Sequence, residues 1–145
     1  MDLILIQDGL GKYVIKDQNE KVLYMCKHKG FNYYIFDENQ LQLAEVKYNL
    51  FSKNKYKLYM NGTLIDEVKS DNKTPKEYTL INKNWRISSD ITYSEFHVTN
   101  EKQEVILSMK NDLSDDPNKW DINIMTSDKL FGIINVVTIL SIAKK

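Results

Sequence analysis

The chain has 145 residues, of which 42% are hydrophobic and 28% are charged, as is usual for a globular protein with one core. Twenty lysine and arginine residues balance twenty aspartate and glutamate residues, and this zero net charge argues against a nucleic-acid-binding protein. Arg86 is the sole arginine, which excludes recognition of phosphate or carboxylate by an arginine cluster. The single cysteine, Cys26, excludes an intramolecular disulfide.

The N-terminal segment from Met1 to Ile6 has no basic region and only a short apolar run, so we expect no signal peptide. We therefore expect a cytoplasmic protein. The chain shows no linker and no low-complexity segment. These features predict a single domain over residues 1–145.

Most of the chain alternates between apolar and polar residues with period two, which is typical of strands with one buried face. Ala44, Val46 and Tyr48, for example, alternate with Glu45 and Lys47. The pattern predicts about twelve antiparallel strands around one core. They cover residues 3–7, 13–16, 22–27, 33–36, 44–50, 56–60, 64–68, 78–81, 85–88, 94–98, 105–110 and 120–124.

Asparagine and aspartate make most of the turns, because the chain has only five glycines and two prolines. Both residue types tolerate left-handed backbone and hydrogen-bond to their own backbone. Asn61-Gly62, between two alternating segments, predicts a two-residue type I′ hairpin. Turns of the same kind are expected at residues 17–20, 37–40, 82–84 and 100–103.

The last segment, Leu130 to Ala143, is an uncharged and almost wholly apolar run. As a helix it measures about 21 Å, short of the roughly 30 Å that a membrane-spanning helix must cross. A pair of strands would suit its β-branched residues, but no turn residue divides it. We favour a buried helix with Ser127 or Asp128 as its N-cap and lysines after its C-terminus.

A helix that is apolar on every side must be surrounded on every side. A closed barrel of twelve strands has a radius of roughly 12 Å and can enclose one helix. We therefore predict an all-β architecture, a closed antiparallel barrel around this C-terminal helix. A stripe of small or polar residues is expected to pass close to the wall, with its polar groups bonded to the helix backbone or to buried water: Gly132, Asn135, Thr138 and Ser141.

Four segments resemble, in the same order, the LURP-one-related family, which includes the YxjI-type bacterial proteins. They are Tyr48–Gly62, Pro75–Leu80, Trp85–Asp90 and Trp120–Ile124, the last of which runs into the apolar segment. The resemblance covers nearly the whole chain from about Gly11.

The resemblance implies the Tubby C-terminal fold, a twelve-stranded barrel around a C-terminal helix that phospholipid scramblases share. For function it implies membrane or phosphoinositide head-group binding in some relatives. It assigns no contact residue here.

The sequence contains no catalytic, cofactor or metal site that we would name. His28 is predicted to lie in a basic turn, and His97 on a strand surface beside Glu95. Cys26 is expected to be a small buried apolar residue. An acidic segment with Asp112, Asp115 and Asp116 lacks the glycine and terminal glutamate of an EF-hand loop and is expected to be a solvated loop.

Four lysines form the one candidate binding site: Lys47, Lys53, Lys55 and Lys57. They cluster around one strand junction and suit an anionic head group, although a solvated outer face is the alternative. We expect a non-enzymatic binding or regulatory module, without a cofactor, whose partner is an anionic lipid or another protein. The alternative is a scramblase-like peripheral membrane protein that binds anionic lipid or phosphoinositide.

Overall fold

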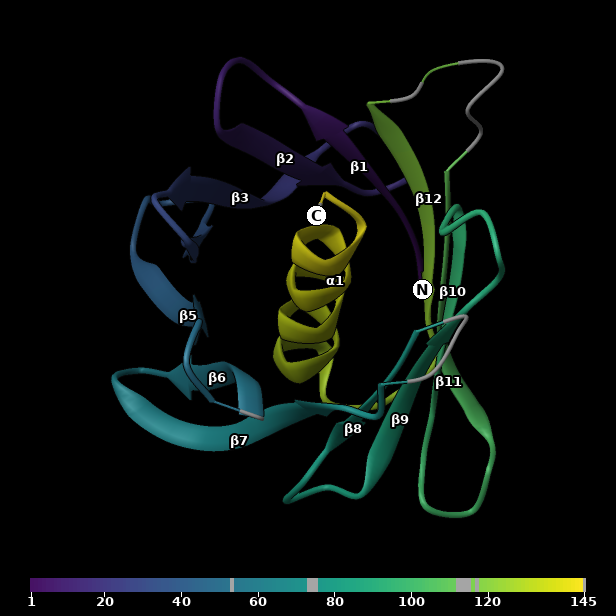
Figure 1. Cartoon of the computed structure of the whole chain (residues 1–145). Helices are drawn as coiled ribbons and strands as arrows, with labels where there is room; N and C mark the ends of the chain where they lie inside the picture. The colour runs from purple at the N-terminus through teal and green to yellow at the C-terminus, as the bar shows by residue number, and fades with distance from the viewer. Residues whose placement is uncertain (53, 73–75, 112–115, 117, 145) are drawn as a thin grey trace.

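The structure, a computed structural model, describes residues 1–52, 54–72, 76–111, 116 and 118–144. Twelve antiparallel strands form a closed barrel, in which each strand pairs with its neighbours in the chain and β1 pairs with β12. The helix α1 (Lys129–Ala143, yellow in Figure 1) lies in the middle of the strands. The strands are β1 (Asp2–Gln7), β2 (Lys12–Lys16), β3 (Val22–Lys29), β4 (Asn32–Asp37), β5 (Gln42–Tyr48), β6 (Asn54–Met60), β7 (Thr63–Ser70), β8 (Glu77–Leu80), β9 (Trp85–Ser89), β10 (Glu95–Thr99), β11 (Val105–Asn111) and β12 (Lys119–Ile124).

This architecture confirms the predicted closed barrel around a C-terminal helix, whereas predictions for Leu50 and His28 were wrong. The strand expected to reach Leu50 ends at Tyr48, because the Asn49 side-chain carbonyl accepts the Phe51 N–H at 3.2 Å and turns the chain. His28 lies in β3 rather than in a turn, and its ring stacks on Tyr33 of β4 at a centroid distance of 4.3 Å.

The helix is buried over its whole middle, with every residue from Phe131 to Ile142 inside the barrel. Asp128 is its N-cap, as predicted, and its carboxylate accepts the Phe131 N–H at 3.1 Å. Within the described residues, no helix is long and apolar enough to cross a membrane. The barrel wall therefore provides the apolar surroundings that the C-terminal run requires.

The small-residue stripe passes close to the wall, as predicted. A side chain at Gly132 would place its Cβ 2.9 Å from Cγ2 of Ile124, a distance that real contacts do not reach. The Asn135 amide and the Thr138 hydroxyl each donate to a helix carbonyl one turn back, both at 2.8 Å. The prediction was wrong for Ser141, whose hydroxyl contacts the Tyr56 hydroxyl of the wall at 3.5 Å.

The loops alternate between the two ends of the barrel, because consecutive strands run in opposite directions. At one end the helix begins, with Gly132 packed against Ile124; we call this end the N-terminal rim. At the other the helix ends, with the Lys144 ammonium 5.9 Å from the Tyr13 ring centre; we call this end the C-terminal rim. The β1–β2, β3–β4 and β5–β6 loops are neighbours on the C-terminal rim.

Candidate functional site

The predicted lysine site lies on the outside of the β5–β6 hairpin, in the half nearer the C-terminal rim. Lys47 of β5 is the register partner of Lys57 of β6, and Lys55 lies one side chain further toward the rim. The structure therefore brings three of the four predicted lysines together. Lys53 lies outside the described residues.

Lys47 has two close neighbours on this surface. Its ammonium lies 3.6 Å from a Glu45 carboxylate oxygen and 5.0 Å from the centre of the Tyr59 ring. The Lys47 side chain is 46% exposed, so water screens both contacts and each contributes little to stability. The Lys47 charge stays at the surface, where an external anion can reach it.

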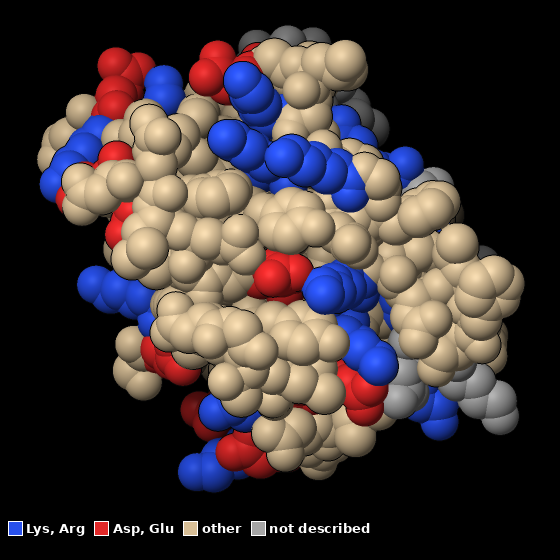
Figure 2. All heavy atoms as spheres, turned by 90° about the vertical axis from the view of Figure 1, so that its left-hand side faces the viewer, with Lys and Arg blue, Asp and Glu red and all other residues tan. Residues whose placement is uncertain are grey.

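Two rows of outward side chains run across β2 to β7 and extend the site well beyond the hairpin. One row, in register order, is Lys29, Asn32, Lys47, Lys57 and Glu67. The other is Lys12, Lys27, Tyr34, Glu45 and Tyr59. Together we call these two rows the basic face. Figure 2 shows its side of the barrel, where blue cationic groups lie on both sides of tan side chains and a red carboxylate.

Sequence reasoning missed Lys12, Lys27 and Lys29 because they are distant in the chain from the hairpin lysines. The strand register joins them: Lys12 pairs with Lys27, and Lys29 connects through Asn32 to Lys47. Their alternation with buried residues was a usable signal for outward orientation. The cross-strand register that makes them one surface was not visible in the sequence.

A hollow of about 610 Å³ lies beside the basic face, between the β5–β6 loop and the end of β7. Lys55 and Lys69 supply its positive charge, and Asp71 supplies a negative one. The Asp71 carboxylate accepts a hydrogen bond from the Thr79 hydroxyl at 3.2 Å. The hollow therefore has the size and charge for a small anionic group beside the rim.

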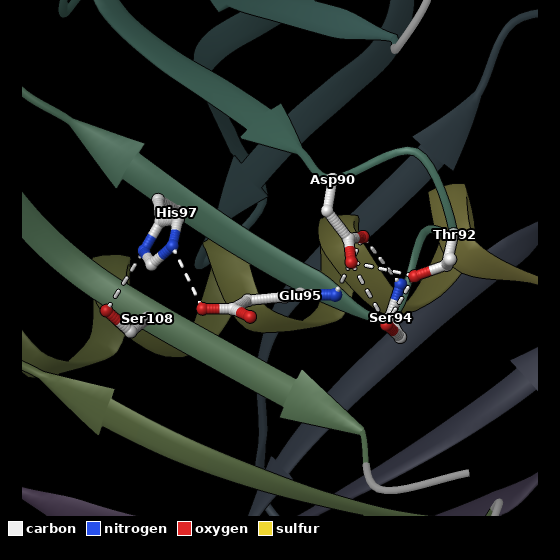
Figure 3. Close-up of polar contacts among 6 residues, drawn as sticks. All are labelled: Asp90, Thr92, Ser94, Glu95, His97 and Ser108. Atoms are coloured by element: carbon white, nitrogen blue, oxygen red, sulfur yellow. Dashed lines mark hydrogen bonds and ion pairs between the residues drawn. The ribbon is translucent and has the colours of Figure 1, made fainter.

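A second group of polar side chains lies on another part of the wall, on β10 and β11 (Figure 3). His97 Nδ1 lies 3.2 Å from the Ser108 hydroxyl, and Nε2 lies 3.4 Å from a Glu95 carboxylate oxygen. The structure thus places His97 on the strand surface beside Glu95, as predicted. The Ser108 contact was not predicted, because it depends on the β10–β11 register.

This order of groups is that of a serine nucleophile, a histidine base and a carboxylate, but its surroundings differ from those of a hydrolase site. The His97 and Glu95 side chains are 41% and 45% exposed, so water surrounds the pair. Acyl transfer also needs free N–H donors for an oxyanion. Ser108 instead lies in the middle of β11, which is paired on both edges with β10 and β12. We interpret the group as a surface hydrogen-bond network.

Asp90 forms a compact turn next to this network (Figure 3). Its carboxylate accepts from the Thr92 hydroxyl at 2.7 Å and from the Ser94 and Glu95 N–H groups at 3.0 and 3.2 Å. Partial desolvation acts to raise the pKa of Asp90, but these hydrogen bonds outweigh it and lower the pKa below its ordinary value. The turn therefore holds Asp90 ionised.

The other residues singled out in the sequence lie in surroundings that suit a role in the fold. Cys26 is buried, and this burial raises the pKa of its thiol far above the ordinary value. Asp116 accepts the Asn118 N–H at 3.0 Å, whereas Asp112 and Asp115 lie outside the described residues. In the described part of the chain, no group of three or more histidine, cysteine or acidic side chains is placed to hold a metal ion.

A comparison with solved structures supports the fold. The chain is similar to a protein from Arabidopsis thaliana whose X-ray structure is known, with a TM-score of 0.70 and 17% sequence identity. The match covers 99% of this chain and 91% of the plant protein. No protein-family model and no curated protein sequence matches the chain. At this identity the similarity shows a shared barrel-and-helix fold.

Proposed function

We propose that the chain is a non-enzymatic, cytoplasmic binding module of the LURP-one-related, Tubby-like type, and that it binds anionic lipid surfaces. The basic face is the observation that carries this proposal. Five lysines lie in its two rows, and the acidic residues of the same rows are Glu45 and Glu67. This surplus gives a neutral chain one positive side.

The chemistry of the basic face suits a lipid surface better than a shaped phosphate site. Lysine is a flexible point charge, whereas bidentate phosphate recognition requires the planar guanidinium of arginine. The sole arginine, Arg86, lies on β9, away from the basic face. Each lysine held near an anionic membrane contributes about 1 kcal/mol, so several exposed lysines provide reversible binding that salt weakens.

Co-sedimentation with lipid vesicles tests the proposal. The intact protein is expected to sediment with vesicles of mixed phosphatidylserine and phosphatidylcholine, and not with phosphatidylcholine alone. Replacing Lys29, Lys47 and Lys57 by glutamine should weaken the partition coefficient by about 100-fold, from roughly 1 kcal/mol for each charge.

A second triple variant provides the matched control. Lys16, Lys21 and Lys102 lie toward the N-terminal rim, and their replacement by glutamine removes the same charge. We expect this variant to keep most of the binding. Equal losses in the two triple variants, or no binding of the unmodified protein to anionic vesicles at low salt, would contradict the proposal.

A further inference from the structure

We infer that the protein docks on the anionic membrane through one side of its C-terminal rim, inserting the tips of three adjacent loops between the lipid head groups. The tips are Leu10 of the β1–β2 loop, Phe31 of the β3–β4 loop and Phe51 of the β5–β6 loop. This inference rests on the proposed lipid binding, and it adds the orientation and depth of the bound protein.

The first supporting observation is the exposure of these apolar tips. Leu10 and Phe51 are each 97% exposed, and Phe31 is 58% exposed. Phe31 contacts the rim through the Tyr48 ring, at a centroid distance of 6.2 Å. Burying an uncovered phenylalanine in an apolar medium is favourable, because apolar surface leaves water. The three tips are thus ready to enter a lipid layer.

The second observation is the position of the lysines directly behind the tips. Lys12 and Lys29 are each two residues from the tip of their own hairpin, a separation of at most roughly 7 Å along the chain. The head-group region of each leaflet is about 5–8 Å thick. Inserted tips would therefore reach the edge of the hydrocarbon while the ammonium groups stay at the level of the lipid phosphates.

The third observation is the shape of the surface. The tips belong to separate hairpin loops between consecutive strands, so they protrude individually around one arc of the rim. A protein partner would need a continuous, complementary surface of several hundred square ångströms on each side. A fluid lipid layer fits separate tips without such a surface. These features favour a membrane over a protein partner.

The distribution of acidic residues on the rim determines the tilt. Asp71, in the β7–β8 loop, lines the same hollow as Phe51, and Lys55 and Lys69 of that hollow offset its charge. Asp90 lies in the β9–β10 loop, opposite the β3–β4 loop on the rim, and Asp116 lies in the β11–β12 loop, beyond the β1–β2 loop. Ile91, which is also exposed, lies next to Asp90 and does not contact the membrane in this orientation. Asp8 belongs to the inserting β1–β2 loop, where its N–H donates to the Lys12 carbonyl at 2.8 Å. In the bound protein the barrel axis is therefore tilted so that the β2–β6 side of the rim lies nearest the membrane.

Site-specific fluorescence tests the depth and orientation. Single cysteines are introduced by Leu10→Cys, Phe31→Cys and Phe51→Cys, and each is labelled with an environment-sensitive maleimide dye. Buried Cys26 should stay unlabelled, which the unmodified protein checks. With phosphatidylserine-containing vesicles we expect a blue shift at all three tips and quenching by lipids that carry a nitroxide in the acyl chain. Lys102→Cys, in a turn of the N-terminal rim, should show neither.

Two serine variants test the contribution to affinity with a matched control. Phe51→Ser is expected to weaken vesicle binding about tenfold or more, because one apolar side chain no longer enters the lipid. Leu41→Ser changes a 63% exposed apolar residue in the β4–β5 loop of the N-terminal rim and should leave binding unchanged. Since Phe51 and Leu41 are both exposed, both variants should fold.

The outcomes separate the inference from the proposed function. Salt-sensitive binding to anionic vesicles without any dye shift at the three tips would overturn the inference and leave lipid binding intact. Equal dye shifts at the tips and at residue 102 would also overturn it, since they indicate no fixed orientation. Absence of vesicle binding by the unmodified protein would overturn both.

Discussion

The two rims of the barrel close their hairpins by different means. At the N-terminal rim, Asp17, Asp37 and Asn100 each accept two backbone N–H groups of their own turn, at 2.8 to 3.0 Å. At the C-terminal rim, the β1–β2 and β5–β6 loops carry Leu10 and Phe51 at their tips, and both side chains are almost fully exposed. These N-terminal turns thus satisfy their own backbone, whereas the β1–β6 side of the C-terminal rim presents the most exposed apolar groups. The contrast is not complete, because Asp90 forms a self-satisfied turn elsewhere on the C-terminal rim and Leu41 is exposed on the N-terminal rim.

This difference separates folding from binding within one barrel. Turns with satisfied polar groups fix strand register, and a change there is expected to alter stability. Leu10 and Phe51 are almost fully exposed and contribute little to the folded core, so a change there is expected to alter association instead. Substitutions at the two rims, and in the helix that connects them, can test this division.

The largest expected effect is at the helix, on which both rims depend. Val137→Asp places a charge in the buried centre of α1, where no cation is available within the apolar core, and should cost several kcal/mol. We expect loss of the folded state, measured by circular dichroism and thermal unfolding. Val137→Ala should remain folded with a lower midpoint. A native melting curve for Val137→Asp would contradict the enclosed position of the helix.

The second-largest loss of stability is expected from a substitution at the N-terminal rim. Buried Asp66 accepts the N–H groups of Asn82 and Lys83 at 2.7 and 3.1 Å and so holds the β8–β9 turn. Asp66→Ala leaves these donors without their acceptor and should lower the free energy of unfolding by about 1–3 kcal/mol in urea titrations. Vesicle binding of the folded variant should not change. Asp71→Ala, on the C-terminal rim, should destabilise less, because that carboxylate accepts one threonine hydroxyl.

A smaller effect is expected from the pH dependence of the Asp90 turn. Hydrogen bonds lower the pKa of this carboxyl in the folded protein, so its ionised form stabilises the fold above the ordinary value of 3.8. That stabilisation is lost as the pH falls through the lowered folded-state pKa. Compared with Asp90→Asn, the unmodified protein should be more stable at neutral pH, and the difference should close in acid. A difference independent of pH would show that ionisation of Asp90 is not involved.

The smallest effect concerns left-handed backbone in the N-terminal turns. Gln40 has a φ of 65°, which a side chain disfavours and glycine accepts freely. Gln40→Gly should therefore raise stability by a few tenths of a kcal/mol, since the relief of strain exceeds the added entropy of the unfolded chain. Gln42→Gly, in strand β5, should lower it by about 0.5–1 kcal/mol. Opposite signs in thermal unfolding would confirm the turn geometry.

Much of the fold was predictable because its signals are local. Alternation of period two located all twelve strands, and Asn61-Gly62 forms the expected hairpin turn, with φ values of 50° and 80°. Leu50 was wrongly placed in a strand, because its position fits the alternation while the side-chain turn of Asn49 ends β5 earlier. The Ser141 partner could not be predicted, since it is 85 residues away in sequence.

The candidate site was only half predictable for a similar reason. Lys47 and Lys57 belong to one hairpin, so their proximity follows from a short connection in the chain. Lys29 joins them through β4, and the β4–β5 register shifts by one residue between Ile35 and Phe36. A register shift of this kind changes which side chains are neighbours across strands, and no sequence pattern predicts it.

The sequence by itself determined the barrel and the helix that it encloses. Half-apolar strands need a core, and an apolar run without charge needs to be enclosed, so the two requirements satisfy each other. Only the tertiary structure decided where the surface chemistry gathers. Strand register aligned the lysines in rows, and the alternation of loops put Leu10, Phe31 and Phe51 on one rim. Burial is set by residue type along the chain, whereas surface neighbours are set by how the strands pair.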